Sequence, residues 1–144
     1  MSEPPPYALA DFLPYLLSEA AETASLKFQD YYRSKYGMLR TEWRVLFHLG
    51  QNAPLHAKDI CARSGIHKTK VSRAVAALEK KRFLVRDEVE NDRRLAVIRL
   101  TRRGETVFED LYRAAERFDA ELMAQFGDEE RDTLRKCLLK LAQV

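Results

Sequence analysis

Basic and small polar side chains alternate over a short stretch in the middle of the sequence. The stretch reads Lys-Thr-Lys-Val-Ser-Arg from residue 68 to residue 73. A helix that enters the major groove of DNA needs little bulk near the base edges and hydrogen-bond donors where bases and phosphates lie. The residues that we expect to contact DNA here are Lys68, Thr69, Lys70, Ser72 and Arg73.

A second basic pair, Arg93 and Arg94, lies further along in a polar stretch between two β-like runs. A guanidinium at the tip of a hairpin can reach phosphates or enter a narrow minor groove. Asp92 precedes the pair and would repel phosphate, so we expect it to orient an arginine through a charge-assisted hydrogen bond. The alternative is that Arg93 and Arg94 only solubilise a turn.

The elements around the basic stretch follow from the spacing of apolar residues. A helix from His67 to about Lys81 buries one stripe, and its members are Val71, Ala74, Val75 and Leu78. A shorter helix over residues 57–64 precedes it, and Ser64-Gly65-Ile66 makes a tight turn between the two. Two helices joined in this way indicate a helix-turn-helix.

Two β-like runs, residues 83–87 and 95–100, predict a hairpin that makes the helix-turn-helix winged. Long amphipathic helices at either end carry apolar faces wider than one small winged domain can cover, which usually marks association. The predicted fold is mainly α with a small β-hairpin wing. We expect one domain over 1–144, with dimerisation helices at 11–34 and 104–144 and a winged helix-turn-helix region at 41–101.

Capping residues predict where several helices begin and end. Asp11, Thr41 and Asp128 are the candidate N-caps, and Gly37 ends the first helix. Pro14 then falls in the first turn of that helix, where a missing N–H is tolerated. The helix that follows Thr41 has little polar surface and is expected to be central and buried.

Composition and charge narrow the class of protein. The chain has 144 residues, of which 46% are hydrophobic and 33% charged, as in a folded globular protein. The net charge of +3 is concentrated: residues 56–103 hold 14 Lys or Arg against 6 Asp or Glu. Such clustering is expected of a nucleic-acid contact.

No apolar run approaches the roughly 20 residues that span a bilayer and no signal segment is visible, so we expect a cytoplasmic protein.

These motifs resemble the MarR family, the multiple-antibiotic-resistance-type regulators. Residues 92–101 fit the wing pattern of that family, Asp-x-Arg, five residues and Leu-Thr, and residues 68–73 and 41–46 support the match. The resemblance implies a winged helix-turn-helix homodimer whose terminal helices interdigitate. It further implies a repressor of transcription that binds a pseudo-palindromic double-stranded operator. Arg82 departs from the pattern, since a glycine usually ends the recognition helix in a left-handed conformation. We therefore expect either a differently shaped helix end or a boundary shifted by one residue, and one more phosphate contact.

The resemblance also implies a small, often aromatic effector that releases DNA. Phe12, Tyr15, Trp43 and Phe47 are the candidate pocket residues, although aromatic residues at helical spacing more often form a core or a dimer interface. We expect Cys61 and Cys137 to be buried small hydrophobes.

The sequence contains no motif of an enzyme, cofactor site or metal site that we recognise. Its three histidines, His48, His56 and His67, lack a ligand spacing, and no phosphate-cradling glycine-rich loop is present. We therefore predict no catalytic activity, no cofactor and no metal. The alternative to a DNA-binding regulator is a basic helical module that binds an acidic protein.

Overall fold

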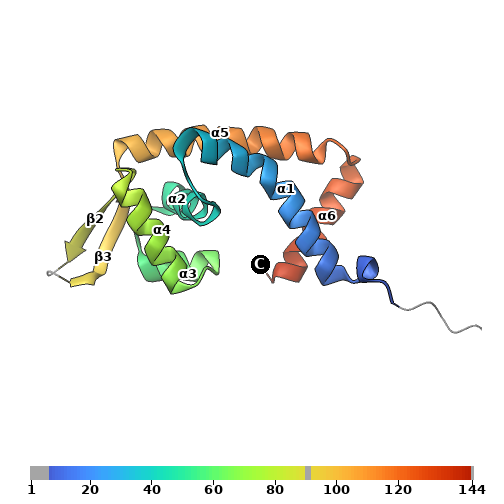
Figure 1. The fold of residues 1–144 in the computed structure, drawn as a ribbon, viewed down its shortest axis with the longest axis horizontal. Helices are drawn as coiled ribbons and strands as arrows, with labels where there is room; N and C mark the ends of the chain where they lie inside the picture. The colour runs from blue at the N-terminus through green and yellow to red at the C-terminus, as the bar shows by residue number, and fades with distance from the viewer. Residues whose placement is uncertain (1–6, 90–91, 144) are drawn as a thin grey trace, which may run out of the picture. The chain divides into compact units, whose positions relative to one another are not determined.

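The computed structural model describes residues 7–89 and 92–143 (Figure 1). The chain divides into two compact units, and the boundary between them in the sequence falls inside one helix, between Phe108 and Glu109. The elements of the first unit are η1 (Leu9–Asp11), α1 (Leu13–Tyr36), α2 (Arg40–Asn52), β1 (Leu55–His56), α3 (Ala57–Ser64), α4 (Lys68–Lys80), β2 (Leu84–Val89) and β3 (Asp92–Leu100). Helix α5 (Arg102–Met123) passes into the second unit, which ends with α6 (Asp128–Ala142). Within the described residues, no helix is long and apolar enough to cross a membrane.

The sheet confirms the predicted hairpin and adds one strand to it. Its order is β1-β3-β2, and both pairings are antiparallel. Strand β2 pairs Leu84 with Leu100, while β1 pairs Leu55 with Ile98. Strand β3 begins at Asp92 rather than near residue 95, because pairing with β2 extends strand geometry into the polar stretch. The two-residue β1 was too short to leave a periodic signal.

Helix α2 is central in the first unit, as expected, and packs against both α3 and α4. Its buried apolar residues are Val45, Leu46 and Leu49. Ile60 of α3 and the predicted stripe of α4 are also buried, and that stripe comprises Val71, Ala74, Val75 and Leu78. The helix-turn-helix is therefore built around one continuous apolar core.

The predicted N-caps are wrong at all three helices. Asp11 ends a 3-10 turn, and α1 begins at Leu13 with Pro14 in its first turn. Helix α2 begins at Arg40, so Thr41 lies inside it, and α6 begins at Asp128 after Gly127. In α2 and α6 the acidic side chain at the third helical position instead accepts a hydrogen bond from the backbone N–H of the residue before the helix. Gly37 ends α1 with φ of 62°, as predicted.

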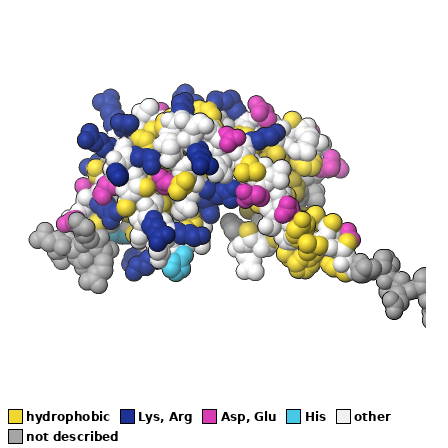
Figure 2. Space-filling model, in the orientation of Figure 1, with side chains coloured by type: hydrophobic (Ala, Val, Ile, Leu, Met, Phe, Trp, Pro, Cys, Tyr) yellow, Lys and Arg dark blue, Asp and Glu magenta, His cyan; other side chains and the backbone are white. Residues whose placement is uncertain are grey.

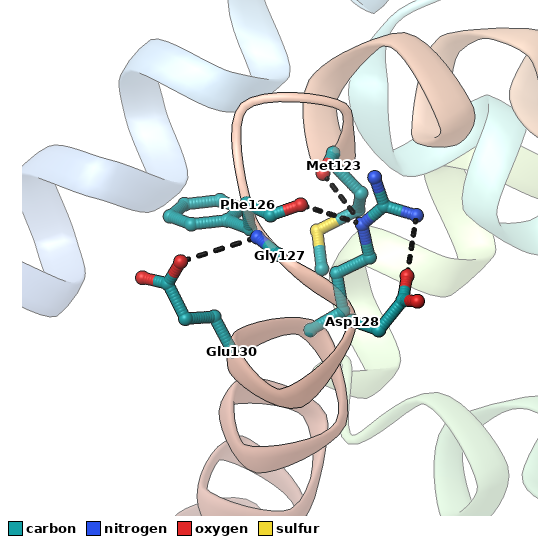
Figure 3. A network of polar contacts seen from close by, with 6 residues as sticks. Met123, Phe126, Gly127, Asp128 and Glu130 are labelled. Carbon is teal, nitrogen blue, oxygen red and sulfur yellow. Dashed lines mark hydrogen bonds and ion pairs between the residues drawn. The ribbon is translucent and has the colours of Figure 1, made fainter.

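In the second unit, a polar network forms the corner between α5 and α6 (Figure 3). Arg131 Nε donates hydrogen bonds to the carbonyl oxygens of Met123 at 2.9 Å and Phe126 at 3.0 Å. The backbone N–H of Gly127 donates to Glu130 Oε1 at 3.1 Å. The Met123 carbonyl also accepts from the backbone N–H of Phe126 at 3.1 Å, so Arg131 and this backbone bond together tie the end of α5 to the turn.

The two cysteines differ from the prediction. Cys61 is half-buried and Cys137 is exposed. Cys137 lies on the predicted apolar face of α6, but no residue of α6 is buried in the single chain. Residues 128–142 form the helix that the apolar spacing predicted, but the single chain does not bury its apolar side chains.

Candidate nucleic-acid interface

The exposed face of α4 carries every residue predicted to contact DNA from this helix. These residues are Lys68, Thr69, Lys70, Ser72 and Arg73, all of them exposed. The opposite face of the helix is the buried stripe, so packing fixes which side chains turn outward. Figure 2 shows Lys and Arg side chains gathered over the part of the molecule that holds α3 and α4. The helix thus presents donors and small side chains together on one surface.

The turn before α4 is held by local hydrogen bonds. Gly65 ends α3 with φ of 69°, which glycine adopts without steric cost. The Ser64 hydroxyl accepts from the backbone N–H of Ile66 at 3.1 Å. Arg44 of α2 donates to the Ser64 carbonyl at 3.1 Å, so the turn is also tied to the central helix. These contacts set where α4 begins.

His67 is the N-cap of α4. Its Nδ1 accepts a hydrogen bond from the backbone N–H of Thr69 at 3.2 Å. This bond requires Nδ1 to be unprotonated, so the neutral ring carries its proton on Nε2. An N–H donor therefore remains on the exposed His67 side chain at the start of the recognition helix.

The end of α4 is a Schellman motif with an arginine where glycine is usual. The backbone N–H of Arg82 donates to the Glu79 carbonyl at 2.9 Å, and that of Phe83 donates to the Leu78 carbonyl at 3.0 Å. Arg82 has φ of 64°, so it adopts the left-handed conformation despite its Cβ. The expectation that arginine would reshape this helix end is therefore wrong.

A contact from the end of the wing holds Arg82 in place. The Thr101 hydroxyl donates to the Arg82 carbonyl at 2.7 Å, and the Thr101 N–H donates to the Phe83 carbonyl at 3.0 Å. A Cβ at Gly104 would collide with the Phe83 carbonyl oxygen, so the first turn of α5 needs glycine to pack here. Sequence reasoning used Thr101 only as the last residue of the wing pattern, and it missed this junction.

The predicted contacts at the tip of the wing lie outside the described side chains. The backbone of Asp92, Arg93 and Arg94 belongs to the start of β3, but the structure describes nothing of their side chains. Closer to the base of the wing, Arg99 Nε and Asp87 Oδ2 form an exposed ion pair at 2.8 Å. The role of Asp92 in orienting an arginine remains a prediction.

Basic side chains also surround a histidine on α2. Burial, together with the charges of Arg44 and Arg63, lowers the pKa of His48 below its usual value. Each of these influences disfavours the protonated ring, because the cation would lose hydration and face two like charges. His48 is therefore neutral where an ordinary histidine begins to titrate.

The candidate pocket residues separate into two groups. Trp43 and Phe47 of α2 contact each other, with ring centroids 5.1 Å apart, and Trp43 also packs on Phe28 and Tyr32 of α1. Phe12 and Tyr15 lie near the start of α1 and are exposed. About 20 Å of helix separates Tyr15 from Phe28, given the rise of 1.5 Å per residue. The structure therefore does not bring the four residues together within one chain.

Sequence and structure comparisons place the chain among known regulators. The family model described as MarR family matches residues 36–95. A helix-turn-helix-type transcriptional regulator of Bacillus subtilis, YwaE, is 29% identical over 126 residues, which cover 88% of this chain and 74% of YwaE. A MarR/EmrR family transcriptional regulator from Acinetobacter is 27% identical, with a TM-score of 0.83 and coverage of 95% and 96% of the two chains.

Two further solved structures share the fold at lower identity. BpsR of Bordetella bronchiseptica, a protein whose DNA binding is regulated by 6-hydroxynicotinic acid, is 20% identical with a TM-score of 0.85. It covers 96% of this chain, which covers 99% of BpsR. MepR of S. aureus, solved as a DNA complex, is 20% identical with a TM-score of 0.81 and coverage of 92% and 97%.

Proposed function

The chain belongs to the MarR family of transcriptional regulators, and from this premise we propose that it is a homodimeric repressor that binds a pseudo-palindromic DNA operator. The observation that carries the proposal is the division of α4 into a buried apolar face and an exposed basic and small face. The existence of a DNA complex of MepR, which shares the fold, supports it.

In this proposal α4 enters the major groove by its N-terminal half. Lys70 and Arg73 donate to bases or phosphates, while Thr69 and Ser72 allow close approach. Arg93 and Arg94 of the wing contact the neighbouring backbone or minor groove, with Asp92 orienting one of them. Two such helices in a symmetric dimer would meet half-sites about 10 base pairs apart, or a multiple of that.

The exposed leucines of α6 support the dimer. Leu138, Leu139 and Leu141 are 41–52% exposed, and no residue of this helix is buried. A cluster of large apolar side chains left in water favours association, because burial would stabilise the complex by about 25 cal/mol for each Å² removed from water. A second copy of the chain is the partner that a closed two-fold assembly requires.

A small effector that lowers DNA affinity completes the proposal. The aromatic cluster at the junction of α1 and α2 contains the candidate residues Trp43 and Phe47, both half-buried and able to contact a flat ring. In an interdigitated dimer, Phe12 and Tyr15 would have to come from the second copy to complete the same pocket. The regulation of BpsR by 6-hydroxynicotinic acid supports an aromatic effector.

Selection of bound duplexes from a random DNA pool, near physiological salt, tests the proposed DNA binding. We expect an enriched inverted repeat. Arg73→Ala should then relax the base preference at one position and cost about 1–3 kcal/mol of binding free energy. Arg73→Lys is the matched control, because it keeps the charge and loses the bidentate geometry. Weak binding that ignores sequence and vanishes with salt would instead favour a basic module for an acidic protein.

A further inference from the structure

Among the described residues, Glu42 is the charged side chain that the fold buries, with 4% of its surface exposed. Its Oε2 accepts a hydrogen bond from the backbone N–H of Leu39 at 3.0 Å, which pairs a free donor at the start of α2. Its Oε1 accepts from Lys81 Nζ, also at 3.0 Å. Both oxygens are therefore used, and they join two elements that are far apart in the sequence.

Lys81 lies at the end of the recognition helix. It is the C-cap of α4, immediately before the left-handed Arg82. The contact of α4 with α2 is otherwise made by its apolar stripe, and apolar burial has no direction. A charged hydrogen bond at one end of the helix adds the directional contact that fixes its orientation.

We propose that Glu42 and Lys81 position the recognition helix for DNA, so that the pair contributes to operator affinity without touching the operator. The inference rests on the proposed function, because it concerns how α4 is presented. Burying the Glu42 carboxylate costs desolvation that an apolar residue of the same volume would avoid, and the Lys81 side chain that pairs with it is still 30% exposed, so stability alone is a weak reason for the pair. At 1.5 Å per residue the 13-residue helix is about 20 Å long, so a small tilt at Lys81 displaces the end that enters the groove.

The proposal and simple electrostatics predict opposite signs for one substitution. Glu42→Gln removes a negative charge, which would strengthen binding to a polyanion if the charge acted only through its field. In our account Gln weakens the contact with Lys81, frees the helix end and lowers operator affinity about tenfold. Binding to a random duplex should change little, because it depends on phosphates rather than on the register of α4.

Substitutions of Lys81 test the same pair without relying on Glu42. Lys81→Met should weaken operator binding while leaving its salt dependence unchanged. Lys81→Arg keeps a cation that can pair with Glu42, so it should bind the operator with wild-type affinity. Lys80→Met is the matched control: it removes the same charge from an exposed neighbour, and should flatten the salt slope by about one unit if Lys80 contacts a phosphate. In the double variant Glu42→Gln with Lys81→Met, the losses should be smaller than the sum of the single losses.

The experiment measures dissociation constants for operator and random duplex at several salt concentrations, with thermal melting of each variant as the check on folding. Operator affinity of Glu42→Gln equal to or above wild type would overturn the proposal. The proposal would also be overturned if Lys81→Met reduced the salt dependence of operator affinity as Lys80→Met does, because Lys81 would then be a phosphate contact. A wild-type protein that fails to prefer any duplex would instead overturn the proposed function, and this inference with it.

Discussion

Helices α4 and α6 have similar lengths, 13 and 15 residues, and both carry apolar residues at helical spacing, yet they differ completely in burial. Helix α4 buries four apolar side chains within the chain, and α6 buries none. Amphipathic spacing thus predicts that a helix has a partner, but it does not say whether the partner belongs to the same chain. The comparison assigns α4 to the folded core, and in our proposal α6 belongs to an association surface.

Helix α1 repeats the same contrast along its length. Phe28 and Tyr32 in its second half are buried, and they pack edge to face with ring centroids 5.4 Å apart. Leu13 and Leu16 in its first half are 51% and 44% exposed. The helix therefore belongs to the winged core at one end and offers an unpaired apolar surface at the other.

The largest effect should come from placing charges on the exposed apolar face of α6. Leu138→Glu combined with Leu141→Glu, three residues apart and so on one face of the helix, should convert a dimer to a monomer of 16.7 kDa, because buried carboxylates without partners are costly. Operator affinity should fall about 100-fold or more, since two linked half-site contacts become independent. Sedimentation measures the mass, and Lys136→Glu is the control on an exposed polar position of the same helix. Unchanged mass for the double variant would remove α6 from the interface.

Truncating one leucine in α4 and one in α6 distinguishes a side chain buried within the chain from one buried only by association. Leu78→Ala in α4 should lower the free energy of unfolding by about 2–5 kcal/mol, because it leaves a cavity in a packed core. That loss should not depend on protein concentration. Leu138→Ala in α6 should lower stability only through association, so its effect on the melting temperature should vary with concentration. Thermal melts over a wide concentration range measure both. Equal concentration dependence for the two variants would contradict the assignment.

A substitution at the end of α4 should have a smaller effect, and it should stabilise the fold rather than destabilise it. Arg82→Gly should stabilise the fold by about 1 kcal/mol, because glycine relieves the Cβ conflict at positive φ. Lys80→Gly, two residues earlier and still helical, should destabilise it by about the same amount. Chemical denaturation gives both values. Destabilisation by Arg82→Gly would mean that the arginine side chain makes a contact worth more than the backbone strain.

The smallest effect is a pH dependence within the first unit. The pKa of His48 is lowered in the folded state, so above the unfolded value of about 6.5 the ring is neutral in both states. As the pH falls below that value the unfolded state binds the proton more readily, and stability decreases. His48→Gln should reduce the loss of melting temperature between pH 7 and about pH 5.5. An identical pH profile in both proteins would rule out this contribution.

Sequence reasoning predicted the parts of the fold that depend on local periodicity. The stripe of α4, the tight turn at Gly65, the hairpin and the end of α1 at Gly37 were all confirmed. These features are set by residues within one helical turn or one hairpin, so the sequence contains the whole signal.

Features that depend on distant partners were missed. The contact of Thr101 with the Arg82 carbonyl joins residues 19 positions apart, and the Glu42–Lys81 pair joins residues 39 apart. The left-handed Arg82 was expected to be avoided, but tertiary hydrogen bonds overrode the local preference. The burial of Cys137 failed for the same reason, because its surroundings in one chain are solvent.

The most direct test of this assembly is the mass of the complex formed with the selected duplex, measured by sedimentation alongside the free protein. We expect two chains on one inverted repeat, with a free particle near twice 16.7 kDa. We also expect the α6 variant with two glutamates to bind a single half-site as one chain. One chain of wild type on the full repeat, or binding that ignores the repeat, would rule out that α4 reads DNA in an assembly held by α6.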